Sequence, residues 1–129
     1  MPLPYSHIPI PTPEDLRAAI PVITAALRLE PARLDLPFAP GKAWTFRQLA
    51  WHLVDLETVF LHRIRLILAE DMPLLPNVDQ EQWAERLPRG RSPELAVRLF
   101  EASRLTLADL LECASGPQRR RMGRHASLG

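Results

Sequence analysis

The sequence predicts an all-α protein, a bundle of long helices, and two observations support this. Apolar residues recur every three or four positions in three long segments, near residues 13–30, 45–70 and 93–115, as they do along one face of a helix. The sequence also lacks the alternating apolar and polar runs of β-strands. A short helix is expected near residues 80–87, and residues 1–129 are expected to form a single domain.

The composition excludes several classes of protein. The net charge of +1 gives no overall field that would select nucleic acid or a membrane surface. No apolar run approaches the roughly 20 residues of a membrane span, and the N-terminus lacks the basic region of a signal peptide. Cys113 is the single cysteine, so an internal disulfide is impossible. We therefore expect a cytoplasmic protein in which Cys113 is a small buried side chain.

Prolines and caps delimit the first helix. Repeated prolines prevent residues 1–12 from forming a helix, so these residues should form an extended arm. Thr12 can cap the helix, with Pro13 in its first turn. Pro21 should kink or split this helix, and Pro31 should end it.

The second helix begins most clearly, because Thr45 and Gln48 form a capping box. Its predicted core face, which includes Leu53 and Phe60, is widened by further apolar residues at 50, 54, 61 and 68. So broad an apolar arc indicates contact with more than one neighbouring helix. The predicted core face consists of Leu49, Leu53, Leu56, Phe60, Ile64 and Ile67.

The last two helices have equally clear start signals. Asp79 can cap the short helix, and Ser92-Pro93-Glu94 can start the third long one. Gly116-Pro117 should end that helix, leaving residues 117–129 as a basic C-terminal loop with arginines at 119, 120, 121 and 124. This loop is either simply solvated or a phosphate or nucleic-acid contact. The predicted inner stripe of the third long helix is Leu95, Leu99, Ala102, Thr106, Leu110 and Cys113.

His52 is the candidate metal ligand, because it lies at the edge of the apolar arc of the second helix. Imidazole is the commonest zinc ligand, and a bundle core is a natural place for a metal. His52 can equally be a half-buried histidine that bonds to a carbonyl or to Asp55. One histidine does not make a metal site, since catalytic sites usually need three protein ligands.

Glu57 falls inside the same apolar arc, where a carboxylate must be paired, metal-bound or protonated. We expect an ion pair with an arginine of another helix, such as Arg104. The alternatives are a general base or metal-linked acid, and simple exposure. His62 is expected on the surface, and His7 and His125 in loops.

The segment WTFRQLAWHLVDLE, Trp44 to Glu57, resembles the pattern of the DinB/YfiT-like superfamily: a tryptophan, a Ser/Thr cap and then H-L-x-D-x-E. Gly41-Lys42 precedes it as in that family. Residues 77–85 are similar to the family's short acidic-tryptophan helix, and residues 123–129 to its G-R-H-x-x-x-G turn before the last helix.

The resemblance implies an up-down four-helix bundle with nearly antiparallel long helices, often dimeric. In that family a nickel, zinc or iron ion is held by one histidine of the second helix and an H-x-x-x-H or E-x-x-x-H pair on the last. Only His52 carries over, because neither pair occurs in this sequence. We therefore expect the last helix to be absent from this chain, and the chain alone not to bind the metal.

The resemblance also implies an enzyme that acts on a small molecule, either a metal-dependent hydrolase or a thiol-dependent transferase, incomplete in this form. The alternative is a metal-free helical module for dimerisation or partner binding. A groove left open between the second and third long helices would expose apolar surface, which favours a homodimer or higher oligomer. Membrane and nucleic-acid partners are not expected.

Overall fold

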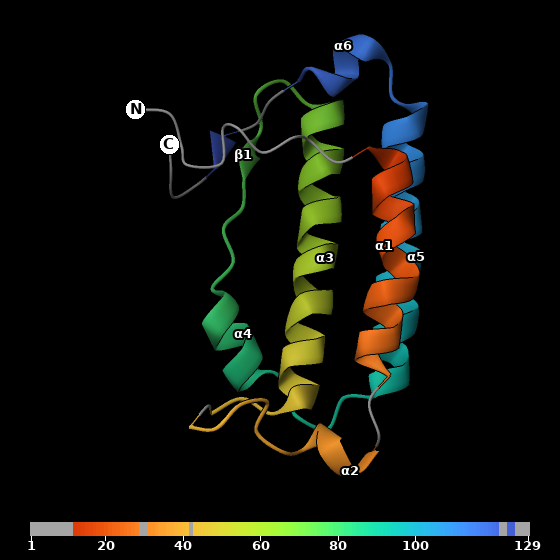
Figure 1. Ribbon diagram of the computed structural model, residues 1–129. Helices are drawn as coiled ribbons and strands as arrows, with labels where there is room; N and C mark the ends of the chain where they lie inside the picture. The colour runs from red at the N-terminus through yellow and green to blue at the C-terminus, as the bar shows by residue number, and fades with distance from the viewer. Residues whose placement is uncertain (1–11, 29–30, 42, 122–123, 126–129) are drawn as a thin grey trace.

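The structure is a computed structural model that describes residues 12–28, 31–41, 43–121 and 124–125 (Figure 1). The all-α class is confirmed, and the described elements include three long helices. The expected arm lies outside the described residues except for Thr12. The elements are α1 (Pro13–Leu27), α2 (Pro31–Leu34), α3 (Phe46–Ala69), β1 (Leu74–Leu75), α4 (Gln80–Arg86), α5 (Pro93–Cys113), α6 (Gly116–Arg119) and β2 (Arg124–His125); β1 and β2 pair in parallel.

The helix starts follow the predicted caps. Thr12 and Thr45 each form a capping box, and Asp79 and Ser92 accept a hydrogen bond from the backbone three residues on. The predicted split of the first helix is wrong, because α1 continues through Pro21. Pro21 lies on the exposed side of α1, where water can reach the backbone group that its missing N–H leaves unpaired.

The direction of the long helices differs from the up-down prediction, because α3 and α5 run parallel and α1 runs against both (Figure 1). Near the start of both parallel helices, the Trp51 indole donates to the Ser92 carbonyl at 3.1 Å. Near their ends, Arg121 donates to the Ile67 carbonyl at 2.9 Å. The prediction of nearly antiparallel packing is therefore wrong for this pair.

The segment after α3 explains the parallel pair. Residues 70–79 include only the two-residue strand β1, and they return the chain along the length of the bundle to α4 (Figure 1). Ten extended residues can span roughly 33–36 Å. The 24 residues of α3 rise about 36 Å. After this segment, α5 therefore begins at the end of the bundle at which α3 began, and the two helices run in the same direction.

The core lies where α5 packs against both α1 and α3. Its best buried aromatic residue is Phe100, which is 2% exposed. The predicted inner stripe of the third long helix is wrong: Leu95 and Leu99 are 56% and 40% exposed, and Cys113 is also exposed. The core cluster consists of Leu27, Ala50, Trp51, Val54, Ala96, Val97 and Phe100.

The apolar arc of α3 is only half covered. Val54 and Leu61 are buried, whereas Leu53 and Phe60, which the sequence placed in the core, are 44% and 51% exposed. The residues predicted as the core face of this helix instead form a row that is only partly covered, with Leu53 and Phe60 exposed and the other members half-buried, and we name this row the α3 ridge. The α3 ridge consists of Leu49, Leu53, Leu56, Phe60, Ile64 and Ile67.

The C-terminal arginines contact helix ends. The predicted loop contains α6, which Ser115 and Gln118 start with a capping box. Arg119 donates to the Leu111 and Glu112 carbonyls at 2.9 and 3.2 Å. Arg121 donates to the Ile67 and Glu70 carbonyls at 2.9 and 2.6 Å and also pairs with Asp71. These side chains satisfy carbonyls that have no partner at the C-termini of α5 and α3.

No helix in the described part of the chain is long and apolar enough to cross a membrane.

An ion pair between Arg17 and Glu112 joins α1 to α5, and the hydrogen bond from Arg17 lowers the pKa of the Glu112 carboxyl. We expect Arg17→Gln to raise the pKa of Glu112 towards its ordinary value, because the main cause of the shift is removed. A folded-state pKa below the unfolded one stabilises the protein above the unfolded pKa, and this contribution is lost as the pH falls through the folded pKa.

The measurement is a carbon-detected NMR titration of the glutamate carboxyls. Arg98→Gln is the control, because Arg98 pairs with Glu94 on the same helix and should leave Glu112 unchanged. An unaltered Glu112 pKa in Arg17→Gln would show that the pair does not persist in solution.

Candidate functional site

His52 lies in the first half of α3 and is half-buried. Its ring centroid is 5.0 Å from that of Trp44, and the two ring planes are inclined by 58°. Trp44 directly precedes Thr45, the N-cap of α3. The Trp44 indole therefore lies close to the start of the helix, where it contacts His52 in the second turn. Leu49 and Leu56 lie one turn to either side of His52, which places the imidazole at the edge of the α3 ridge.

Asp55 is not the partner of His52. Its two carboxylate oxygens accept from Arg91 at 3.1 and 3.0 Å, and the Arg91 guanidinium stacks 4.3 Å from the Trp51 ring centroid. Among the side chains that the structure describes, none forms a hydrogen bond with the His52 imidazole. The interpretation of His52 as a histidine bonded to Asp55 is therefore wrong.

Sequence reasoning missed Arg91. It lies in the short connection between α4 and α5, where no periodicity indicates a direction. The one available signal was the need of half-buried Asp55, on a helix with a broad apolar arc, for a cationic partner.

Glu57 is 6% exposed and forms the predicted ion pair with Arg104. Arg104 Nε and NH2 donate to the two carboxylate oxygens at 2.6 and 2.9 Å. The guanidinium also lies 5.1 Å from the ring centroid of Phe100. With both oxygens held by the same guanidinium, Glu57 acts as a bridge between α3 and α5, an arrangement that does not favour a free general base.

The described residues do not provide a complete metal site. His62 is exposed, as predicted. His7 lies outside the described residues, and only the backbone of His125 is described. Within the described ranges no group of three histidine, cysteine, aspartate or glutamate side chains is placed to hold an ion. A catalytic metal usually has three protein ligands, so His52 would need further ligands beside it.

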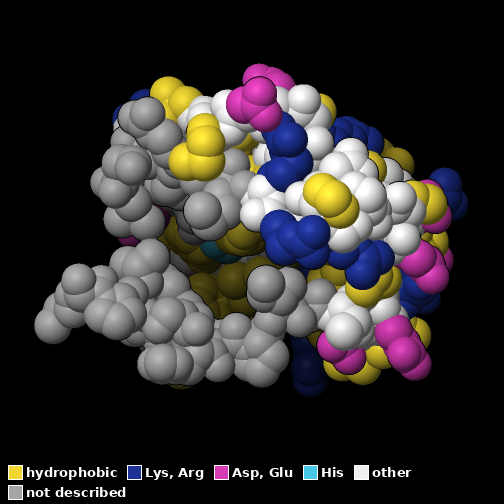
Figure 2. All heavy atoms as spheres, turned by 90° about the horizontal axis from the view of Figure 1, so that it is seen from above, with side chains coloured by type: hydrophobic (Ala, Val, Ile, Leu, Met, Phe, Trp, Pro, Cys, Tyr) yellow, Lys and Arg dark blue, Asp and Glu magenta, His cyan; other side chains and the backbone are white. Residues whose placement is uncertain are grey.

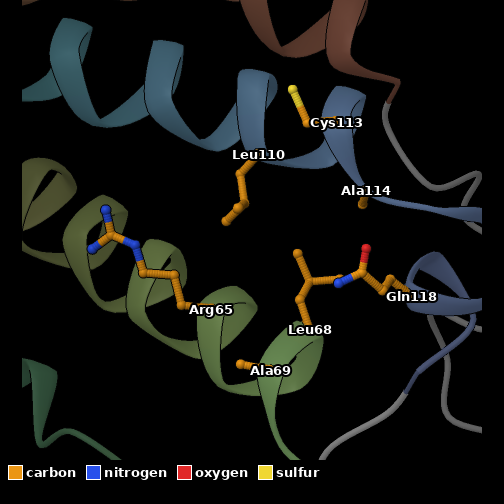
Figure 3. A pocket seen from close by; sticks show the side chains of 7 residues that line it. All are labelled: Arg65, Leu68, Ala69, Leu110, Cys113, Ala114 and Gln118. Carbon is orange, nitrogen blue, oxygen red and sulfur yellow. The ribbon is translucent and has the colours of Figure 1, made fainter.

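A pocket of about 370 Å³ lies at the other end of α3, beside Cys113 (Figure 3). The Cys113 thiol is 3.9 Å from an Asp109 carboxylate oxygen. Arg65 lies 13 positions beyond His52, a rise of about 20 Å along α3, so this pocket is separate from the His52 region. The pocket is lined by Arg65, Leu68, Ala69, Leu110, Cys113, Ala114 and Gln118.

Two curated relatives carry the provisional name of metal-dependent hydrolase. A Bacillus licheniformis protein is 33% identical over 90 residues, which are 69% of this chain and 51% of the relative. An Oceanobacillus iheyensis protein is 29% identical over 97 residues, 75% of this chain and 56% of the relative. The chain thus spans about half the length of the curated relatives it matches.

Among solved structures, the chain is similar to YfiT from Bacillus subtilis, described provisionally as a metal-dependent hydrolase with an unusual four-helix bundle topology. The TM-score is 0.78 at 23% identity, and the match covers 98% of this chain and 75% of YfiT. This likeness shows the fold. The profile of the DinB superfamily matches residues 13–126. The chain therefore belongs to the DinB superfamily and has the YfiT-like four-helix bundle fold.

Proposed function

We propose that this chain supplies the bundle and one metal ligand, His52, of a metal-dependent hydrolase of the DinB type. The observation that carries the proposal is the position of His52: its imidazole has no hydrogen-bond partner among the described side chains and borders the partly covered α3 ridge. A further helix packed on that ridge would bring its own side chains next to the imidazole. The provisional names of the relatives favour hydrolysis over transfer to a thiol.

His52 alone does not hold a divalent ion, so at least two ligands must come from outside the described residues. Imidazole suits nickel, zinc and iron, and the proposal does not depend on which of them is used. Trp44 contributes by packing against the imidazole in a tilted arrangement, which limits the orientations that the ring can take.

The test compares two forms of the protein by elemental analysis after exhaustive dialysis. The 129-residue chain should retain no stoichiometric metal. A chain extended at its C-terminus by the last helix of a relative should retain one ion per chain. In the extended form His52→Ala should abolish retention, and His62→Ala, which changes an exposed histidine ten positions further along α3, should leave it unchanged.

Each departure from this pattern has a definite meaning. An extended form that retains no metal, or that retains it after His52→Ala, would overturn the proposal. The first of these results would favour the metal-free interaction module instead. Stoichiometric metal in the 129-residue chain would show that other ligands, such as His125 or Glu57, complete a site without the further helix.

A further inference from the structure

We infer that Arg121 is a positioning residue for the His52 site, because it holds the chain that follows α5 against the end of α3. In the function proposed above, on which this role rests, a further helix packs on the α3 ridge beside His52. Since α3 and α5 run parallel, the chain leaves α5 at the end of the bundle away from His52 (Figure 1). A segment that follows α5 must therefore cross to α3 and turn back to reach the imidazole.

Three consecutive arginines make different contacts at this crossing. Arg119 donates to two carbonyls near the end of α5, eight and seven positions back, and so holds α6 to the helix that it follows. Arg121 donates to the Ile67 and Glu70 carbonyls, 54 and 51 positions back, and so holds the chain after α6 to the end of α3. The exposed Arg120 side chain forms no hydrogen bond with the rest of the described chain.

The strands β1 and β2 set the direction of the chain after Arg121. They pair in parallel, with Leu74 opposite Arg124. β1 leads into residues 76–79, which run back along the bundle to α4, so β2 points towards the end at which α3 begins (Figure 1). Arg63 holds this returning segment to α3, since its Nε and Nη2 donate to the Pro76 carbonyl at 3.1 and 2.8 Å.

Arg121 also lies at the far end of the α3 ridge. Arg119 and Arg121 line a cavity of about 430 Å³ together with Ile64 and Ile67 of the ridge. Figure 2 shows, from this end of the bundle, a hollow with a hydrophobic floor and basic side chains beside it.

The distance from this point to His52 makes a fixed start important. His52 lies 15 positions before Ile67, so a helix that runs against α3 from here comes level with the imidazole after a rise of about 22 Å. Metal ligands must be held within about 0.5 Å of the productive geometry, and a helix whose start is not fixed can shift along the ridge.

The first test uses the 129-residue chain and needs no metal. NMR should detect contacts between the backbones of Leu74 and Arg124 in the unsubstituted protein. Arg121→Gln should abolish these contacts, because so short a strand pair does not persist once the tie to α3 is lost. Arg120→Gln removes the neighbouring charge and should leave them in place. Contacts that persist in Arg121→Gln would overturn the inference.

The second test measures zinc affinity in the extended form described above, by competition with a chelator. Arg121→Gln should weaken the affinity about tenfold or more, because zinc binds only the fraction of molecules in which the further helix is in place. Arg120→Gln should leave the affinity unchanged. Arg17→Gln is the control for stability, since it removes an ion pair between α1 and α5 without touching α6. Circular dichroism should show the same helix content in all three variants.

The outcomes separate the positioning role from the proposed function. Equal zinc affinity in Arg121→Gln and in the unsubstituted extended form would overturn the positioning role. So would an equal loss in Arg17→Gln and Arg121→Gln, because the affinity would then follow overall stability. An unsubstituted extended form that binds no zinc would overturn the proposed function, and the NMR test distinguishes that failure because it involves no metal.

Discussion

Replacement of Arg104 by alanine should lower the free energy of unfolding by about 3–5 kcal/mol. Arg104 holds both oxygens of Glu57, and the two side chains are only 15% and 8% exposed. Without the guanidinium, a carboxylate between α3 and α5 would lose its counter-charge and both of its strongest hydrogen bonds. The measurement is chemical denaturation followed by circular dichroism.

Arg98→Ala is the matched control, since Arg98 lies on the same helix and pairs with Glu94 in water, with 73% and 56% of the two side chains exposed. Its loss should change the unfolding free energy by less than about 0.5 kcal/mol. The double variant Glu57→Leu, Arg104→Leu should cost less than Arg104→Ala alone, because it leaves no buried charge unpaired. Equal, small losses for Arg104→Ala and Arg98→Ala would mean that water reaches the Glu57 carboxylate.

The features that could be predicted from the sequence are those set by neighbouring residues or by a simple physical requirement. Thr12, Thr45, Asp79 and Ser92 each start a helix as expected, because a cap depends on the chemistry of a few adjacent positions. The partner of Glu57 could also be anticipated, since a carboxylate inside an apolar arc requires a cation.

The features that could not be predicted depend on which element packs where. The periodicity of α3 shows an apolar arc but not which half of it meets a neighbour. The sequence therefore predicts Leu53 and Phe60 in the core, whereas the buried side is centred on Val54 and Leu61. The parallel arrangement of α3 and α5 follows from residues 70–79, which span the length of the bundle although their sequence shows neither helical nor strand periodicity.

The candidate site likewise has features that the local sequence predicts and features that depend on tertiary contacts. His52 could be located from the sequence, because its place on the helical wheel follows from its position in α3. Its contact with Trp44 depends on how the chain enters the helix, and the Asp55–Arg91 pair that excludes Asp55 as its partner joins residues 36 positions apart. Helical periodicity carries no information on contacts of this kind.

Phe100→Ala should lower the free energy of unfolding by about 3–5 kcal/mol, as truncations of buried phenylalanine do. Phe100 is 2% exposed and belongs to the cluster that joins α5 to α3 and α1, so the cavity left by the ring would adjoin both contacts. Chemical denaturation followed by circular dichroism measures the loss.

Phe60→Ala is the matched substitution, because it removes the same side chain from a ring that is 51% exposed on the α3 ridge. It should cost less than about 1 kcal/mol, since much of that ring is already in water. A larger loss of unfolding free energy for Phe60→Ala than for Phe100→Ala would mean that the α3 ridge, and not the side with Val54 and Leu61, faces the core in solution. Because the Arg104 guanidinium lies over the Phe100 ring at 5.1 Å, the losses for Phe100→Ala and Arg104→Ala should not add in the double variant.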